Sequence, residues 1–245
     1  EKNLKFDIAI AGSDFAINYI YKKCFCFNGR FIDNGMPRND ILLMHNNEYK
    51  NKIKNVLNID KNTKIVIFCP TFSDKYANKP VKQEFPFNIS KLLITLEKST
   101  NSKWILLYRS HHVKSVSYNL ESTLCRDVSD YGDMADLLFV SDFLITDYSS
   151  SACDFILANK PAILFQIDKE YTDYRNLIVE DNENPFIIAH SEEELYDYSS
   201  TIVAKNNYDY FDKIKTFYGM RQKNNSSYYI CEYIIKFCEG KLNEK

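Results

Sequence analysis

Short apolar runs alternate with longer amphipathic stretches along most of the chain. The runs, rich in Ile, Val, Leu and Phe, are typical of strands that are buried on both faces of a sheet. These predicted strands cover residues 6–12, 64–70, 103–109, 124–128, 143–147, 161–165 and 186–190. The stretches between and after them predict helices over residues 13–24, 45–57, 88–100, 133–140, 149–158, 191–206 and 226–239. Alternation of this kind predicts an α/β fold with a doubly wound, Rossmann-like parallel sheet.

One segment interrupts the alternation and indicates a domain boundary. Residues 28–43 contain two glycines and a proline, and we interpret them as a hinge near residue 43. The hinge divides the chain into residues 1–43 and 44–245. Residues 74–87 hold two prolines and several charges, which predicts a loop over the functional site. Because the chain opens on Glu1 and enters a strand almost directly, we expect it to be a piece of a longer protein.

The composition is that of an ordinary globular protein. Of 245 residues, 45% are hydrophobic and 26% are charged, which argues against disorder. A net charge of −2 gives no electrostatic case for nucleic acid as a partner. No apolar run reaches 18 residues, and we find no signal peptide. With six glycines and neither a Walker loop nor a GxGxxG fingerprint, the chain is not expected to bind phosphate through a glycine-rich loop.

Seven cysteines are scattered along the chain without a CxxC pair. Most of them sit inside apolar runs, which favours buried free thiols over a metal site or a disulfide framework. Free thiols in turn favour a reducing, cytoplasmic location.

The most informative stretch is 143-FLITDYSSSACDFILANKPAILF-165, in which a predicted strand runs into a hydroxyl-rich turn and then a helix. The turn contains Thr146, Asp147, Ser149 and Ser150. Unpaired N–H groups at a helix start favour an anion, and serine hydroxyls add donors to phosphate oxygens. The alternative is ordinary helix capping by a serine, with Asp147 bonded to a neighbouring amide. Spacing alone leaves both interpretations open.

A second polar group follows the predicted strand 103–109. Arg109 and His111 at a strand's carboxyl end are suited to bind a phosphate and to stabilise charge on a departing one. The alternative is a surface arginine and histidine in a connecting loop. His112 is adjacent to His111, but two imidazoles without a third ligand make a poor metal site, so we predict no metal. Asp168 follows the predicted strand 161–165 and could hydrogen-bond a ribose or a polyol. The alternative is that it lies in a solvated connector.

Taken together, several segments resemble the CDP-glycerol glycerophosphotransferase family, which includes polymerases and primases of wall teichoic acid and related capsule enzymes. The resemblance covers essentially the whole chain, as the C-terminal part of a family member, and is most continuous between Val128 and Asp168. The segments that carry it are 35-GMPRND-40, 69-CPTFSD-74, 108-YRSHH-112, 128-VSDYGDMADLLFVSDFLITDYSS-150 and 160-KPAILFQID-168.

The resemblance implies a GT-B type fold, in which two Rossmann-like domains flank the active site. Residues 1–43 would be the end of the N-terminal, acceptor-side domain, and residues 44–245 the domain that binds the CDP-linked donor. His111 and Arg109 would be catalytic, with His111 as the acid toward the departing phosphate. The donor and its phosphates would be bound by Ser149, Ser150, Asp147, Thr146, Thr71, Phe72, Arg38 and Asp168.

The sequence departs from the family pattern in three places, two of them near the expected polyol end of the donor. His112 replaces the usual proline after the histidine. Residues 171–177, YTDYRNL, lack the usual glycine after arginine, and residues 223–229, KNNSSYY, replace an Asp-Gly-Lys-Ala-Ser element. The family's general base, a histidine followed by glycine, has no counterpart here, because no His-Gly pair occurs.

The function implied by the resemblance is transfer of glycerol phosphate, or a related polyol phosphate, from CDP-glycerol to a hydroxyl of a teichoic-acid-like or capsular polymer, with release of CMP. The acceptor would be a lipid-linked or polymeric glycan, which implies a cytoplasmic protein with peripheral contact at the inner face of the cell membrane. The resemblance implies CDP-glycerol as the donor substrate and assigns no cofactor, and it leaves open whether a divalent metal assists. Two alternatives remain: a GT-B glycosyltransferase that uses a nucleotide sugar, and a nucleotide-binding fragment that is inactive without its N-terminal domain.

Overall fold

The computed structural model describes residues 6–71, 81–111, 116–118, 120, 123–167, 177–204 and 208–241. The chain divides into two compact units. The larger unit is the continuous stretch 45–211, and the smaller unit combines residues 1–44 with residues 212–245. The sequence placed a boundary near residue 43 and assigned everything after it to one domain. In the structure, residues 212–245 cluster with the N-terminal segment instead, and the division falls inside a helix, α7 (Tyr208–Tyr218).

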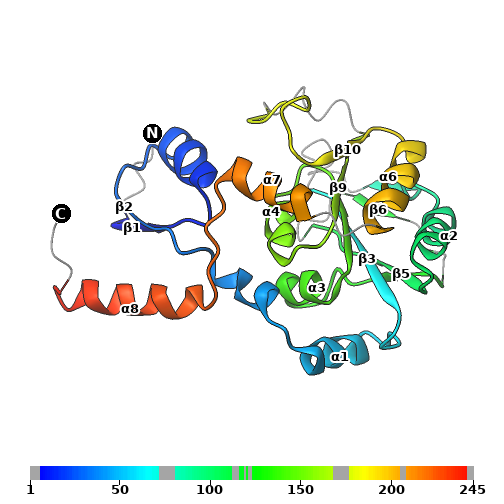
Figure 1. Ribbon diagram of the computed structural model, residues 1–245, viewed down its shortest axis with the longest axis horizontal. Coiled ribbons are helices and arrows are strands. Elements are labelled where there is room, and N and C mark those ends of the chain that lie inside the picture. The colour runs from blue at the N-terminus through cyan, green and yellow to red at the C-terminus, as the bar shows by residue number, and fades with distance from the viewer. Residues whose placement is uncertain are drawn as a thin grey trace. The chain divides into compact units, whose positions relative to one another are not determined.

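The larger unit is built on a six-stranded sheet in which every neighbouring pair is parallel (Figure 1). In spatial order its strands are β10 (Ile187–Ala189), β9 (Ala162–Phe165), β8 (Phe143–Thr146), β3 (Lys64–Cys69), β5 (Trp104–Tyr108) and β7 (Cys125–Asp127). Most of their apolar side chains are buried, as near-continuous hydrophobic runs predict for a sheet that is covered on both faces. The predicted α/β class with a doubly wound parallel sheet is confirmed.

Helices cover both faces of this sheet (Figure 1). They are α1 (Asn47–Val56), α2 (Ile89–Thr100), α3 (Met134–Val140), α4 (Ser151–Phe155) with the 3₁₀ turn η4 (Ile156–Ala158), and α6 (Glu192–Ala204). Alternate strand residues such as Val66, Leu106 and Ile145 join one apolar cluster with the buried faces of α2 and α6. The intervening strand residues point to the opposite face, since successive side chains of a strand alternate.

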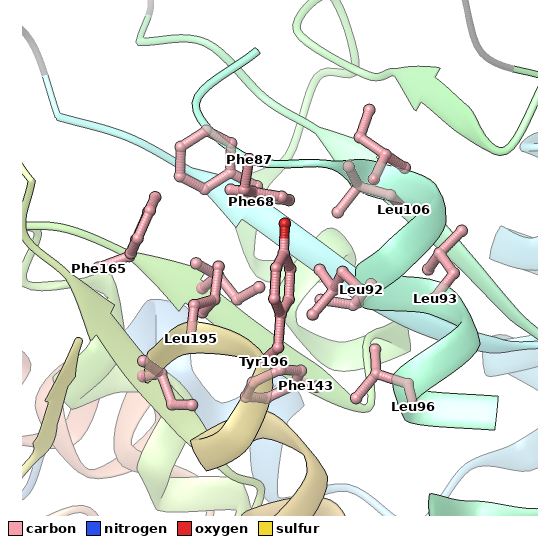
Figure 2. Close-up of a cluster of buried hydrophobic side chains, with 14 of the residues drawn as sticks. Phe68, Phe87, Leu92, Leu93, Leu96, Leu106, Phe143, Phe165, Leu195 and Tyr196 are labelled. Atoms are coloured by element: carbon pink, nitrogen blue, oxygen red, sulfur yellow. The ribbon is translucent and has the colours of Figure 1, made fainter. Parts of the chain in front are cut away.

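The cluster beneath α2 and α6 is the main core of the larger unit. Figure 2 shows Phe68, Phe143 and Phe165 of the sheet converging with Leu92 of α2 and Tyr196 of α6. The apolar face that the sequence predicts for α2 is fully buried, and the helix begins where its cap predicts. The Asn88 side-chain oxygen accepts a hydrogen bond from the Lys91 N–H at 2.9 Å.

A small sheet that the sequence did not predict lies in the segment interpreted as a loop. Strand β4 (Val81–Gln83) pairs in parallel with β6 (Val116–Tyr118). The aromatic rings of Phe85 and Tyr118 pack against Phe68, with centroid separations of 5.4 and 6.3 Å. The loop prediction is therefore wrong for residues 81–83, because aromatic packing next to this short, polar strand outweighs its weak local pattern. Residues 72–80 lie outside the described part of the chain.

The smaller unit contains a parallel pair of short strands and helices drawn from both ends of the chain. Its elements are β1 (Ile8–Ile10), the π-type helix η1 (Ala16–Cys24), β2 (Arg30–Ile32), the 3₁₀ helix η2 (Pro37–Leu43) and α8 (Ser226–Cys238). The Asp40 carboxylate accepts hydrogen bonds from the N–H groups of Ser226 and Ser227 at 2.8 and 2.9 Å. A carboxylate from η2 thus caps a helix that begins 186 residues later.

All seven cysteines are free thiols, as predicted, but only Cys69 is buried. The prediction of buried thiols is wrong for the four in the smaller unit, which are exposed: Cys24, Cys26, Cys231 and Cys238. They lie within or next to η1 and α8, whose apolar side chains are partly exposed in the same way.

At the amino edge of the large sheet, a lysine closes the end of α3. The Lys160 ammonium donates hydrogen bonds to the carbonyl oxygens of Phe139 and Ser141 at 2.6 and 2.7 Å. A third, longer bond of 3.4 Å reaches Leu138. These carbonyls belong to a helix end that has no intrahelical donors for them. Burial lowers the pKa of Lys160 to about 7.

Candidate functional site

The strand order of the large sheet identifies where a ligand can bind. Chain order runs outward from β3 through β5 to β7 on one side, and then through β8, β9 and β10 on the other. The direction therefore reverses between β3 and β8. In open parallel sheets, ligands bind beyond the carboxyl ends of the strands at such a switch point. The polar segments that the sequence singled out follow the carboxyl ends of β3, β5, β8 and β9.

A hydrogen-bonded pair spans this switch point. The Asp147 carboxylate, directly after β8, accepts two hydrogen bonds from the Thr71 N–H, at 2.8 and 3.0 Å. A third comes from the Thr71 hydroxyl at 2.9 Å. We call these contacts the Thr71–Asp147 clamp. It joins the loop after β3 to the turn after β8 and so fixes the floor of the switch point.

Burial and the clamp act in opposite directions on the pKa of Asp147. Burial raises the pKa of this carboxyl, while the hydrogen bonds from Thr71 and from the Tyr148 N–H, at 2.6 Å, oppose the rise. The Asp147 carbonyl accepts a long hydrogen bond of 3.4 Å from the buried side chain of Gln166, which follows β9. The carboxylate is thus occupied by neighbouring donors, which suits a residue that shapes the turn.

Thr146 has no exposed surface, and its hydroxyl donates to the Cys69 carbonyl at 2.5 Å. Cys69 and Thr146 are register partners in the β3–β8 pairing. In the free protein this hydroxyl therefore stabilises the strand ends beneath the clamp.

The serines of the turn remain closer to the surface. Ser150 is exposed at the N-cap of α4, and its side chain makes no capping hydrogen bond. The Ser149 hydroxyl accepts hydrogen bonds from the N–H and the hydroxyl of Ser151, at 3.2 and 3.0 Å. A helix thus starts in this turn as predicted. The serine hydrogen bonds at its start, however, run between Ser151 and Ser149 and do not come from the N-cap residue Ser150. The Ser150 side chain thus lies exposed at the start of α4 without a capping role.

Arg109 directly follows β5, which lies two strands from β8, and its side chain is held on the β7 side. Its N–H donates to the Phe68 carbonyl at 3.0 Å, which continues the β3–β5 pairing. Its Nη1 donates to the carbonyls of Tyr131 and Val128 at 2.7 and 3.3 Å. Among the described residues, the guanidinium's hydrogen bonds involve Nη1 alone. These contacts hold the guanidinium beside the turn after β7, so Arg109 is more than a solvated surface residue.

The other predicted site residues divide into three groups. His111 is partly buried two residues beyond Arg109, at the end of a described segment. Arg38 is exposed at the start of η2, in the smaller unit. Phe72 and Asp168 lie outside the described residues, so their predicted roles stay predictions.

Two contributors were missed from the sequence. Gln166 directly follows β9, so its position after an apolar strand was an available signal. Tyr131 contributes a backbone carbonyl to Arg109, and a carbonyl carries no residue-specific signal in a sequence. Within the described part of the chain, no group of three His, Cys, Asp or Glu side chains is arranged to hold a metal ion.

Together, the strand order, the clamp and the polar turn define a Rossmann-like α/β domain of the GT-B type. The profile of the CDP-Glycerol:Poly(glycerophosphate) glycerophosphotransferase family matches residues 1–236. The chain belongs to this family of glycerophosphotransferases, and the resemblance inferred from the motifs is confirmed.

Individual relatives agree with the family assignment. The chain is 36% identical over 172 residues to a teichoic acid poly(glycerol phosphate) polymerase of Bacillus spizizenii, covering 68% of this chain and 42% of the relative. It is 27% identical over 250 residues to a teichoic acid glycerol-phosphate transferase of Staphylococcus aureus, covering 96% and 62%. The solved structure of the wall teichoic acid polymerase TagF superposes with a TM-score of 0.78 at 25% identity, covering 97% and 60%. The chain thus spans less than two thirds of each relative's length.

Proposed function

We propose that this chain carries the donor-binding part of a transferase that moves glycerol phosphate, or a related polyol phosphate, from CDP-glycerol to a hydroxyl of a teichoic-acid-like or capsular polymer. CMP is the second product. The observation that carries the proposal is the clamped, hydroxyl-rich turn at the switch point of the sheet, in a member of this family. The larger unit would bind the donor, and residues before the hinge would belong to the acceptor side.

The proposed reaction is a phosphoryl transfer. The acceptor hydroxyl oxygen bonds to the phosphorus of the glycerol phosphate and loses its proton to a base. The bond between that phosphorus and the bridging oxygen breaks, and the electron pair leaves with CMP. The sequence offers no His-Gly base, so we assign proton removal to a residue outside this chain. The larger unit must then stabilise the negative charge that grows on the departing phosphate.

Four side chains supply that stabilisation in our proposal. Ser149 and Ser150 present hydroxyls from the turn after β8, and Arg109 presents a guanidinium from the next strand but one. His111 donates a proton to the departing phosphate, a general-acid role that histidine side chains commonly fill. Thr71, Thr146 and Asp147 act indirectly by fixing the turn. Loss of one preorganised donor to a developing charge typically costs on the order of 100- to 1000-fold in rate.

The acceptor and the cellular setting are also proposals. We infer a lipid-linked or polymeric glycan acceptor, reached by a cytoplasmic protein that touches the inner membrane face. A polymer with polyol phosphate units and a CDP-activated donor both fit the family. Among the helices that the structure describes, none has the length and apolar character needed to cross a lipid bilayer.

Ligand-dependent melting tests the donor assignment. A ligand that binds only the folded state raises the melting temperature according to its affinity. We expect CDP-glycerol or CDP-ribitol to stabilise the chain more than UDP-glucose at equal concentration. Stabilisation by UDP-glucose alone would replace the proposal with a glycosyltransferase that uses a nucleotide sugar.

Product release tests whether the chain acts without further residues. CDP-glycerol is incubated with the chain and a polyol phosphate acceptor, and CMP is quantified by chromatography. Binding without CMP release would identify a nucleotide-binding module that depends on the remaining part of a longer protein. CMP release that requires both acceptor and Arg109 would establish the transferase.

A further inference from the structure

A network of hydrogen bonds extends from Arg109 into the helices behind it. The Tyr131 carbonyl accepts from the Arg109 Nη1, and the Tyr131 hydroxyl donates to the Asp136 carboxylate at 3.1 Å. The other oxygen of that carboxylate accepts from the Tyr49 hydroxyl at 2.9 Å. Asp136 lies on α3 and Tyr49 on α1, so the network ties the turn after β7 to two helices.

The turn that carries Tyr131 is tied at both ends, by the Ser129 hydroxyl, which accepts from the Ser110 N–H at 2.9 Å, and by Asp133, which caps α3. Its Gly132 is so open that an added Cβ would meet no atom within 4 Å. The Tyr131 N–H donates to the Val128 carbonyl at 3.0 Å, which closes a tight turn but does not fix its tilt. Between these ends, the hydrogen bond from the Tyr131 hydroxyl to Asp136 joins the middle of the turn to the body of α3. It therefore helps to fix the position of the Tyr131 carbonyl.

Arg109 in turn depends on that carbonyl. A long guanidinium side chain has many rotamers, and fixing one of them costs entropy. The two carbonyls that accept hydrogen bonds from Nη1 restrict the guanidinium to one orientation, which is the orientation a phosphate would meet. Misplacement of a binding group by about 1 Å is enough to cost on the order of 100-fold in activity.

We propose that Tyr131 and Asp136 are positioning residues, which act through the Tyr131 carbonyl to hold the Arg109 guanidinium toward the donor's diphosphate. Tyr49 supports the same carboxylate from α1. This inference rests on the proposed function, since it takes Arg109 to be a phosphate ligand. Neither hydroxyl needs to touch the donor.

Nucleotide binding by the full chain tests the proposal without any acceptor. The affinity for CDP is measured by titration calorimetry, and that for cytidine, which lacks phosphate, by NMR titration. The variants are Tyr131→Phe, Asp136→Asn, Arg109→Ala and the double variant of Tyr131→Phe with Arg109→Ala. The matched control is Tyr228→Phe, which removes a hydroxyl that donates to Glu232 at 2.8 Å in the smaller unit.

We expect Arg109→Ala to weaken CDP binding by about 10- to 100-fold, as loss of a charged hydrogen bond does, and to leave cytidine binding unchanged. Tyr131→Phe and Asp136→Asn should each weaken CDP binding by roughly fivefold, again without an effect on cytidine, while the control has none. In the Arg109→Ala background, Tyr131→Phe should have no further effect, because the group it positions is gone.

The outcomes separate the two proposals. If Tyr131→Phe weakens CDP and cytidine binding equally, or weakens CDP binding by the same factor in both backgrounds, its role is general stability and the positioning inference is wrong. If Arg109→Ala weakens CDP binding and Tyr131→Phe does not, only the network fails. If Arg109→Ala binds CDP as the unaltered chain does, or if that chain binds no CDP, the proposed site fails and the network with it.

Discussion

We predict that the Thr71–Asp147 clamp contributes substantially to the free energy of unfolding. Replacing Asp147 with Ala removes the acceptor for the Thr71 N–H, the Thr71 hydroxyl and the Tyr148 N–H. A partly buried donor left without a partner costs about 1–3 kcal/mol. Two backbone donors lose their partner here, while the raised pKa of Asp147 indicates that its burial already costs some stability. The net expectation is a loss of about 3 kcal/mol in the free energy of unfolding.

Graded variants assign this loss to particular bonds. Thr71→Val removes only the hydroxyl bond to the carboxylate, for which we expect about 1.5 kcal/mol. Asp147→Asn keeps one acceptor oxygen and should fall between the two. Because both residues share the same contact, the double variant should lose less than the sum of the single losses.

Urea unfolding followed by circular dichroism measures these changes. The matched control is Asp60→Ala, since the Asp60 carboxylate also accepts a backbone hydrogen bond, from Asn62 at 2.8 Å, but in an exposed turn. We expect the control to lose less than about 1 kcal/mol. If Asp147→Ala were no more destabilising than Asp60→Ala, or if the Thr71 and Asp147 effects were additive, the clamp would not hold the two strand ends together.

Three further predictions concern other parts of the molecule. The pKa of Lys160 falls from 10.5 unfolded to about 7 folded, so between these values the unfolded state binds the extra proton and stability rises with pH. Between pH 7 and pH 9, urea unfolding should show a gain of up to about 2.5 kcal/mol in the free energy of unfolding, and this gain should be absent in Lys160→Met. An equal change in the free energy of unfolding in both proteins would refute the prediction. Asp40→Ala should cost about 1–2 kcal/mol by uncapping α8, with a loss of helical circular dichroism, whereas an unchanged spectrum and midpoint would argue against the cap. Ser150→Ala should reduce the rise in melting temperature that CDP-glycerol causes. The melting temperature without ligand should change by no more than about 1 °C, because the Ser150 hydroxyl makes no capping hydrogen bond. An unchanged rise with CDP-glycerol would exclude Ser150 from the site.

The large sheet was predictable because its strands are buried on both faces. The run 64–70 became β3 (Lys64–Cys69), and the run 161–165 became β9 (Ala162–Phe165). Strand β4 was missed because Val-Lys-Gln carries little apolar signal, and its place depends on neighbouring aromatic rings. The return of residues 212–245 to the smaller unit was missed for a similar reason. The contact of Asp40 with Ser226 joins distant positions and leaves no periodic trace.

The candidate site was only partly predictable. Ser149, Ser150 and Arg109 were singled out because each follows an apolar strand, and parallel strands present their carboxyl ends at one edge. What the sequence could not supply was the partner of each group. Thr71 and Asp147 are 76 residues apart, so their pairing follows from strand order alone. The carbonyl that holds Arg109 depends on how the turn after β7 folds.

The discontinuity of the smaller unit has a consequence for the order in which the protein is completed. Residues 1–44 are translated before the stretch 45–211, whereas their packing partners, residues 212–245, are translated after it. The continuous stretch 45–211 has all its residues available earlier and can fold as a unit during synthesis. Residues 1–44 therefore cannot complete their packing until residues 212–245 have also emerged from the ribosome.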